Sequence, residues 1–130
     1  MSVTVEKIND GHFKLKCSVC DKTASDIQNG IPEYWNELCS IFTGITHSQA
    51  VDLKYAKKIY TLLNKNAIKE LHDFLKNKKL LDLGIDSYCP ECDACYCEEH
   101  FHVNAVIDED GFYDYSTGYC PHMHERILDD

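Results

Sequence analysis

Alternating hydrophobic and polar residues open the chain in the pattern of a β-hairpin. Val3, Val5 and Ile8 precede the turn sequence Asn9-Asp10-Gly11, and Phe13 and Leu15 follow it. Asn, Asp and Gly tolerate the positive φ that tight hairpin turns require. We therefore expect two strands here, and residues 23–27 are typical of a third strand.

The hydrophobic period changes twice along the next part of the chain. Residues 28–47 show no clean period, so we expect a packed connection with a short helix at 33–41. From residue 48 the apolar residues recur at three- and four-residue steps with lysines between them, which predicts an amphipathic helix over 48–64. A second apolar stripe predicts another helix over 66–77. We expect a helical hairpin within residues 48–83.

A second β-hairpin is predicted near the end of the chain. Residues 103–107 and 112–115 are rich in β-branched and aromatic side chains, and the acidic turn Asp108-Glu109-Asp110-Gly111 separates them. The predicted elements together indicate an α+β fold in one domain over residues 1–130, with an N-terminal part at 1–47 and a C-terminal region at 84–130.

Cysteine and histidine residues recur in close pairs. Members of a pair are separated by two or three residues, which lets both side chains bind one tetrahedral ion. Eight such ligands predict two zinc ions, around which we expect the β-hairpins to be arranged. The four pairs are Cys17/Cys20, Cys89/Cys92, Cys97/His100 and Cys120/His124.

Disulfides and a redox pair are the alternatives for these cysteines. Residues 1–6 lack the basic and apolar regions of a signal peptide, so we expect a cytosolic protein without a membrane segment, in which disulfides are rare. A thioredoxin-like Cys-x-x-Cys opens a helix, whereas the strand-like segment at 23–27 follows Cys20. Both observations favour metal, and Cys17–Cys20 then has the form of a zinc knuckle.

The ligand pairs allow two arrangements. Sequential pairing joins the second and third pairs around one ion, as compactly as a retroviral-type zinc knuckle, and leaves the outer pairs for the other. Alternate pairing joins the first pair to the third and the second to the fourth. We favour the alternate arrangement: site 1 is Cys17, Cys20, Cys97 and His100, and site 2 is Cys89, Cys92, Cys120 and His124.

This alternate order resembles the cross-braced sites of RING-type and FYVE-type domains. The 68 residues between Cys20 and Cys89 are long for those families, so RING function is not carried over. His122 and His124 are nearly equivalent in sequence, and we assign the ligand role to His124. Cys95, His102 and His122 could each replace a chosen ligand, but we expect Cys39 and Cys95 to be non-ligands. We expect His47 in a loop or helix cap and His72 on a solvated helix face.

The C-terminal part also resembles a group of small uncharacterised bacterial proteins. In that group a Cys-Pro-x-Cys, a Tyr-Cys-x-x-His, an acidic hairpin with Gly-aromatic and a terminal Cys-Pro-x-Gly-His follow one another. Residues 88–130 match this order, except that Met123 stands in the place of the last glycine. The resemblance implies a zinc-binding fold and brings no settled activity.

Charge is unevenly distributed along the chain. The net charge is −9, and residues 80–130 carry thirteen acidic residues against Arg126 alone. Such a surface repels a nucleic-acid backbone and suits a basic protein partner. The lysines of 48–79 indicate either a solvated helix face, which we favour, or a basic docking patch. The expected partner-binding residues are Glu98, Glu99, Asp108, Glu109, Asp110, Tyr113 and Asp114.

Charge and size point to a non-catalytic, zinc-stabilised binding protein. A bacterial immunity protein or antitoxin that neutralises a basic toxin is its most concrete form. The alternative is a zinc-dependent, hydrolase-like enzyme, but the chain lacks both His-Glu-x-x-His and the deaminase His-x-Glu signature. A nucleic-acid-binding zinc module ranks third, because bidentate guanine reading needs arginines and Arg126 is the only one.

Overall fold

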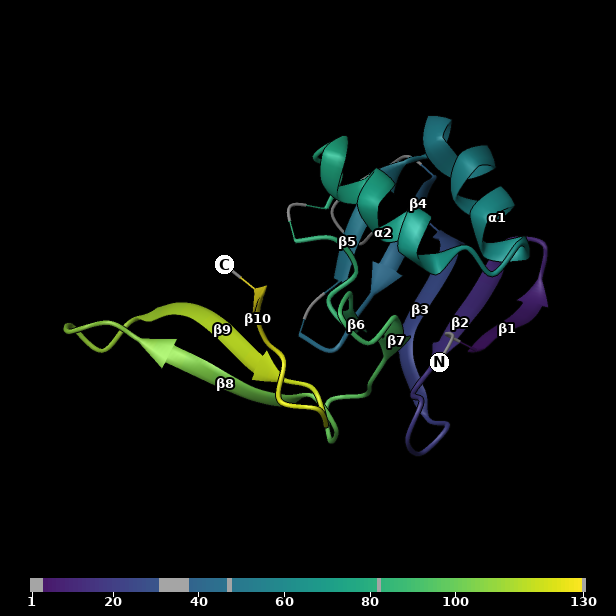
Figure 1. The fold of residues 1–130 in the computed structure, drawn as a ribbon. Helices are drawn as coiled ribbons and strands as arrows, with labels where there is room; N and C mark the ends of the chain where they lie inside the picture. The colour runs from purple at the N-terminus through teal and green to yellow at the C-terminus, as the bar shows by residue number, and fades with distance from the viewer. Residues whose placement is uncertain (1–3, 31–37, 47, 82, 130) are drawn as a thin grey trace.

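The structure is a computed structural model that describes residues 4–30, 38–46, 48–81 and 83–129. It is an α+β fold made mostly of antiparallel β-strands with two short helices (Figure 1). Neither helix in the described part of the chain is long and apolar enough to cross a membrane.

A five-stranded antiparallel sheet forms the N-terminal half, with its strands in chain order. The predicted opening hairpin is confirmed, and the strand predicted at 23–27 extends to Gly30. The five strands are β1 (Thr4–Asn9), β2 (His12–Lys16), β3 (Thr23–Gly30), β4 (Cys39–Thr43) and β5 (Ser48–Asp52).

The last two strands correct the predicted helices in this part of the chain. Residues 39–41 of the predicted 33–41 helix belong to β4, and residues 31–37, like His47, lie outside the described part of the structure. The helix predicted from residue 48 was also wrong over 48–52, because β5 pairs with β4 along its whole length. Val51 is buried opposite Ser40 in this ladder. Its position also matched the helical period, but β-branched residues such as valine favour strands, and here it belongs to one.

The helical hairpin exists but is shorter than predicted. A 3₁₀ turn (Leu53–Tyr55) leads into α1 (Ala56–Asn64), and α2 (Ile68–Asn77) follows. Both helices cover one face of the sheet (Figure 1). The largest side chains buried between them are Phe13, Leu15, Ile27, Ile59, Leu63, Leu71 and Leu75, which we call the first core.

His72 belongs to this core, which corrects its expected place on a solvated helix face. Its side chain is only 2% exposed, and its ring centroid lies 4.9 Å from that of Tyr88. Nδ1 accepts a hydrogen bond of 3.0 Å from the backbone N–H of Ile85. Gly84 leaves room for the ring, because a Cβ there would lie 2.4 Å from it. His72 therefore connects α2 to the segment that enters the cysteine-rich region.

The C-terminal region forms two smaller sheets. The predicted second hairpin is confirmed, and a third strand, absent from the sequence prediction, pairs with its other edge. This hairpin projects away from the five-stranded sheet and the helices (Figure 1). The strands are β6 (Tyr88–Cys89), β7 (Ala94–Cys95), β8 (His102–Ile107), β9 (Tyr113–Tyr119) and β10 (Glu125–Asp129).

Two charged side chains, the buried Asp86 and the half-buried Arg126, tie the halves together. Asp86 accepts hydrogen bonds from the backbone N–H groups of Ile45 and Thr46, each 3.1 Å, and from the Thr46 hydroxyl at 2.8 Å. Arg126 on β10 donates to the carbonyl oxygens of Leu83, Ile85 and Tyr88. Buried charges need such partners, so these contacts fix the position of β10 against the first core.

Candidate metal centres

Two clusters of four side chains each bring three thiols and one imidazole together. Within each cluster the ligand atoms all lie within 4.8 Å of one another. The first cluster is Cys17, Cys20, Cys97 and His100, and the second is Cys89, Cys92, Cys120 and His124. The side chains are therefore grouped in the alternate order along the chain, and the sequential grouping is excluded.

The first cluster is built from two tight turns. Cys17 directly follows β2, and its carbonyl accepts from Asp21 N–H at 3.0 Å while its own N–H donates to Lys22 O at 2.7 Å. Asp21 has a φ of 63°, which closes the turn. The Val19 N–H points at the Cys17 sulfur at 3.5 Å, as expected for a zinc knuckle. Cys97 starts a similar turn whose carbonyl accepts from His100 N–H.

The second cluster combines the β6–β7 turn with the loop between β9 and β10. Cys89 lies on β6, and Asp93 with a φ of 52° closes the turn after Cys92. Cys120 follows β9, and its sulfur accepts from the backbone N–H groups of His122 at 3.3 Å and His124 at 3.4 Å. Met123 adopts a φ of 67°, so the chain turns here in the left-handed region that glycine usually occupies.

The spacing of the donor atoms fits zinc. A tetrahedral Zn²⁺ with ordinary Zn–S and Zn–N bonds holds two sulfurs about 3.8 Å apart and a sulfur and a nitrogen about 3.5 Å apart. In the first cluster the Cys20 and Cys97 sulfurs are 3.6 Å apart, and His100 Nδ1 lies 3.3 Å from the Cys97 sulfur. In the second the Cys92 and Cys120 sulfurs are 3.7 Å apart. All eight cysteines of the chain are free of disulfides.

Burial and backbone hydrogen bonds act in opposite directions on the thiol pKa values. Burial raises the pKa of Cys89 to about 12 and also raises that of Cys97. Burial opposes ionisation of Cys17 and Cys120 as well, yet donating backbone N–H groups lower the pKa of Cys17 to about 7 and that of Cys120 below its usual value. Several thiolates packed this closely require a cation, and a divalent ion supplies it.

Two side chains that sequence reasoning missed support the second cluster. His124 directs Nδ1 at the sulfurs, 3.3 Å from both Cys92 and Cys120, and its Nε2 lies 3.1 Å from a carboxylate oxygen of Glu91. A carboxylate in this position fixes the tautomer and orientation of a metal-binding imidazole. The signal was present in the sequence, because Glu91 lies inside the Cys89–Cys92 turn.

Tyr96 is the other missed side chain. Its hydroxyl is buried and has no oxygen or nitrogen partner among the described residues. Burial raises its pKa, and the nearby Cys92, Cys120 and Cys89 raise it further, so the hydroxyl lies near the sulfurs of the second cluster. A thiolate that binds metal is the acceptor that this O–H lacks elsewhere.

The other cysteines and His122 lie outside both clusters. Cys95 is fully buried on β7 opposite Tyr88, and burial raises the pKa of its thiol to about 12. Cys39 is buried on β4. His122 is exposed, its ring centroid lies 6.4 Å from that of His124, and only its backbone contacts a ligand sulfur. The structure thus separates His122 from His124, which the sequence left nearly equivalent.

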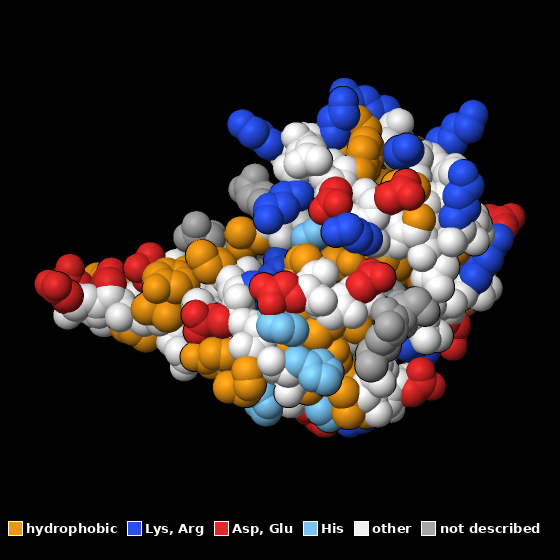
Figure 2. Space-filling model, in the orientation of Figure 1, with side chains coloured by type: hydrophobic (Ala, Val, Ile, Leu, Met, Phe, Trp, Pro, Cys, Tyr) orange, Lys and Arg blue, Asp and Glu red, His pale blue; other side chains and the backbone are white. Residues whose placement is uncertain are grey.

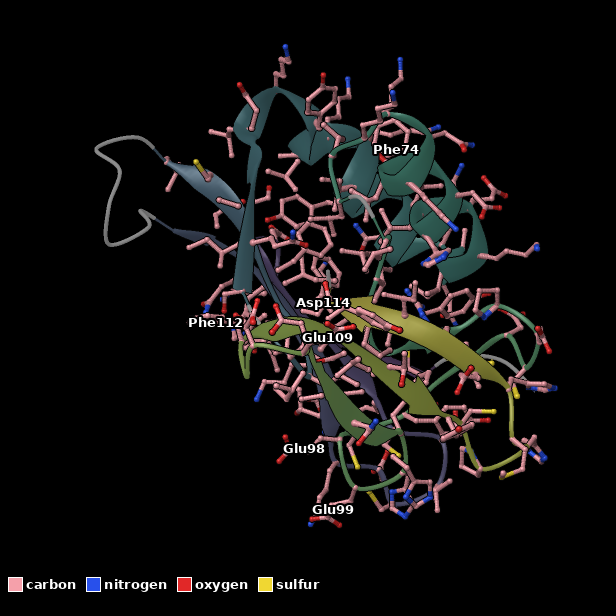
Figure 3. The ribbon with its side chains drawn as sticks, turned by 90° about the vertical axis from the view of Figure 1, so that its left-hand side faces the viewer. Phe74, Glu98, Glu99, Glu109, Phe112 and Asp114 are labelled. Carbon is pink, nitrogen blue, oxygen red and sulfur yellow. The ribbon has the colours of Figure 1, made fainter. Side chains whose placement is uncertain are left out.

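The expected partner-binding carboxylates fall into two groups. Glu98 and Glu99 lie beside the first cluster, where Glu99 pairs with Lys22 at 3.0 Å (Figure 3). The other group occupies the turn between β8 and β9, at the far end of the projecting hairpin (Figure 2). Asp108, Glu109 and Asp110 lie in the turn itself and Asp114 lies at the start of β9, and all four are exposed.

The turn at the end of the hairpin has a defined shape. Asp108 Oδ1 accepts from the backbone N–H groups of Asp110 and Phe112, each at 2.9 Å. Phe112 is nevertheless 70% exposed and Tyr113 49% exposed, and the Tyr113 hydroxyl is 2.8 Å from that of Ser116. An ordered acidic turn therefore presents two aromatic side chains to solvent.

Comparison with known proteins places the chain in a family. Neither the curated proteins nor the solved structures contain a significant match to it. A family model described as a domain of unknown function, DUF8328, matches residues 6–130 and so covers both clusters and every strand of the C-terminal region. The chain belongs to the DUF8328 family.

Proposed function

We propose that this protein is a non-catalytic binding protein in which two zinc ions hold an acidic arm in place for a basic protein partner. The arm is the β8–β9 hairpin with its connecting turn, residues 102–119. The observation that carries the proposal is the ordered, exposed turn and the start of β9, where Asp108, Glu109, Asp110 and Asp114 flank Phe112 and Tyr113 in the sequence.

The composition of the clusters favours a structural role for zinc. Catalytic zinc sites have three protein ligands and keep one position for water or substrate. Each cluster here supplies four donors, which complete a tetrahedron. The first cluster connects the turn between β2 and β3 to the residues just before β8. The second cluster connects β6 to the residues just after β9. Zinc would therefore fix the base of the arm from both sides.

The chemistry of the arm's end suits a basic protein surface. Its carboxylates would steer a positively charged partner and raise the association rate, while exposed aromatic side chains provide the contact area that slows dissociation. We propose a basic toxin as the partner, with this protein as its immunity protein or antitoxin, on the basis of charge and size. The absence of disulfides among the eight cysteines suits the reducing cytosol, where we place the protein.

We propose that the binding surface lies at the turn between β8 and β9, at the tip of the arm. Glu98 and Glu99 lie at the opposite end of β8, and the Glu99 carboxylate is already paired with Lys22. We expect the turn residues to carry the interaction, with Glu98 and Glu99 contributing only to the long-range field. This difference supplies a matched control for the experiment below.

The test is partner capture from the native host followed by kinetics with the purified partner. Reversing Asp108, Glu109 and Asp110 to lysine should slow association at least about tenfold and flatten its salt dependence, because the steering charge is removed. Tyr113→Ala should mainly speed dissociation. The control, Glu98→Lys with Glu99→Lys, should change association much less, and every variant must retain two zinc ions.

Two results would contradict the proposal. Unchanged capture and kinetics after the triple reversal would exclude the arm as the binding surface. Hydrolysis of a substrate by the zinc-loaded protein alone, lost when a cluster cysteine is replaced, would establish the enzymatic alternative.

A further inference from the structure

The outer edge of β8 is an open strand edge without the usual protection. The three-stranded sheet has the order β10-β9-β8, so among the described residues no strand pairs with the outer side of β8 (Figure 1). Exposed edges are normally protected by charged side chains or proline. β1, β5 and β10 each carry charged residues, whereas β8 reads His-Val-Asn-Ala-Val-Ile and carries no lysine, acid or proline.

The apolar side chains of β8 are exposed on one face. Side chains alternate along a strand, so Val103, Ala105 and Ile107 point to the same side. Val103 is 41% exposed, Ile107 is 53% exposed, and Ala105 is also exposed. The pairing irregularity with β9 leaves this alternation intact, because Val106 pairs with Tyr115 and Ile107 with Tyr113, which makes Asp114 the extra residue.

We propose that the β8 edge pairs antiparallel with the β8 edge of a second copy of this chain, about a two-fold axis at Ala105. Ala105 then lies opposite Ala105 of the second copy, and Val103 lies opposite its Ile107. The two three-stranded sheets become one continuous sheet. The paired strands bring the three exposed apolar side chains of each copy together on one face, and cross-strand pairs of this kind stabilise sheets.

The charge distribution selects this antiparallel arrangement. A parallel pairing would place two acidic turns side by side in a protein whose net charge is already −9. The antiparallel arrangement puts the turns at opposite ends of the dimer. It also places Asp108 opposite His102 of the second copy, where an imidazole N–H can donate to the carboxylate. β8 itself carries no acidic residue that would attract a basic partner. The β8 edge of a second copy is therefore a better complement to it than a basic protein is.

The dimer is separate from the proposed function. The end of the arm stays exposed in it, so one dimer presents two acidic turns to partners. The contact is one six-residue strand per copy, which places it among small, reversible interfaces. A concentration-dependent equilibrium between monomer and dimer is therefore expected.

Sedimentation of the zinc-loaded full chain tests the proposal. The mass should rise from 14.9 kDa toward twice that value with concentration. Ala105→Lys places two like charges opposite each other and should raise the dimer dissociation constant at least about tenfold. The matched control is Thr117→Lys, which adds the same charge on β9, away from the edge, and should leave the constant nearly unchanged. Both variants must retain two zinc ions.

The register of the proposed β8–β8 pairing is tested by isotope-filtered NMR of a dimer mixed from labelled and unlabelled chains. Val103 and Ile107 are about 13 Å apart along one strand, so an NOE between them must be intermolecular. Such NOEs are the expected result. A monomer at millimolar concentration, equal effects of the two lysine variants, or a dimer without these NOEs would overturn the proposal. Partner binding is measured separately. Unchanged partner binding by Ala105→Lys would show that the proposed function does not depend on the dimer.

Discussion

At the scale of single residues, eight side chains account for both clusters, and their neighbours in the sequence do not substitute for them. Cys92 and Cys95 show the contrast, because they lie three residues apart and belong to different environments. The Cys92 sulfur is 3.7 Å from that of Cys120, whereas Cys95 is fully buried in the first core, beside Tyr88. Only the Cys92 side chain faces the other potential metal ligands.

Cys92→Ser should lower the zinc content of the purified protein from two ions per chain to one and unfold the second cluster. Binding of a structural zinc contributes on the order of 10 kcal/mol, and a serine hydroxyl replaces a thiolate poorly. Metal analysis and the NMR spectrum provide the readouts. Cys95→Ala and Cys39→Ala are the controls and should keep both ions. A native Cys92→Ser protein with two zinc ions would refute the ligand assignment.

His72 supplies a prediction about pH. Burial lowers the pKa of His72 to about 4, and the nearby positive charge of Arg126 lowers it as well. The unfolded chain then binds more protons than the folded protein between the two pKa values. The stabilising contribution of the neutral ring is complete above its unfolded pKa and is lost as the pH falls toward the folded one. Acid should therefore weaken the contact between α2 and Ile85.

The expected loss in unfolding free energy attributable to His72 is about 1 kcal/mol between about pH 7.5 and about pH 5.5. Denaturant unfolding of the wild type and of His72→Asn at both pH values measures it, because the Asn carbonyl can accept the Ile85 N–H without titrating. The effect of pH on the metal centres cancels in this comparison. Equal pH dependence in the two proteins would show that His72 does not titrate in this way.

At the scale of elements, the sequence predicted hairpins better than it separated helix from strand. The turn Asn9-Asp10-Gly11 and the acidic turn at 108–111 carry local signals, and both hairpins are confirmed. β5 carries no such signal, because Val51 fits a helical step equally well and only pairing with β4 decides its conformation. β4 lay in a stretch without a period. Tertiary pairing of this kind is not visible in a local window.

The grouping of the clusters shows the same division between local and long-range information. The ligand pairs were visible in the sequence because each forms a short turn of its own. Which pairs meet depends on contacts between distant parts of the chain. Cys20 and Cys97, whose sulfurs lie close together, are 77 positions apart in the sequence. Burial of His72 and the role of Glu91 depend on the same tertiary arrangement. Sequence spacing could favour the alternate grouping but could not exclude the sequential one.

At the scale of the whole molecule, two cores of different chemistry lie side by side. The first core lies between the five-stranded sheet and the helices and is mostly aliphatic and aromatic. The second core contains Cys17, Cys89, Cys97 and Cys120 together with Tyr96, Phe101, Ala94 and Leu128. Half of its buried residues are thus cluster cysteines. We expect a core with this composition to lose most of its cohesion when no metal is bound to the thiols.

Zinc removal should therefore unfold the C-terminal region before the rest of the protein. Hydrogen exchange after treatment with a strong chelator should show protection lost in β6–β10 and retained in β2–β4, α1 and α2, since the first core contains no cluster residue. The Asp86 contacts to Ile45 and Thr46 cannot hold the arm alone, because net hydrogen-bond contributions are small beside that of zinc binding. Restoring two equivalents of zinc should restore protection throughout. Simultaneous loss of protection in both cores would instead show that the first core also depends on the metal, and unchanged protection would show that the clusters do not stabilise the fold through zinc.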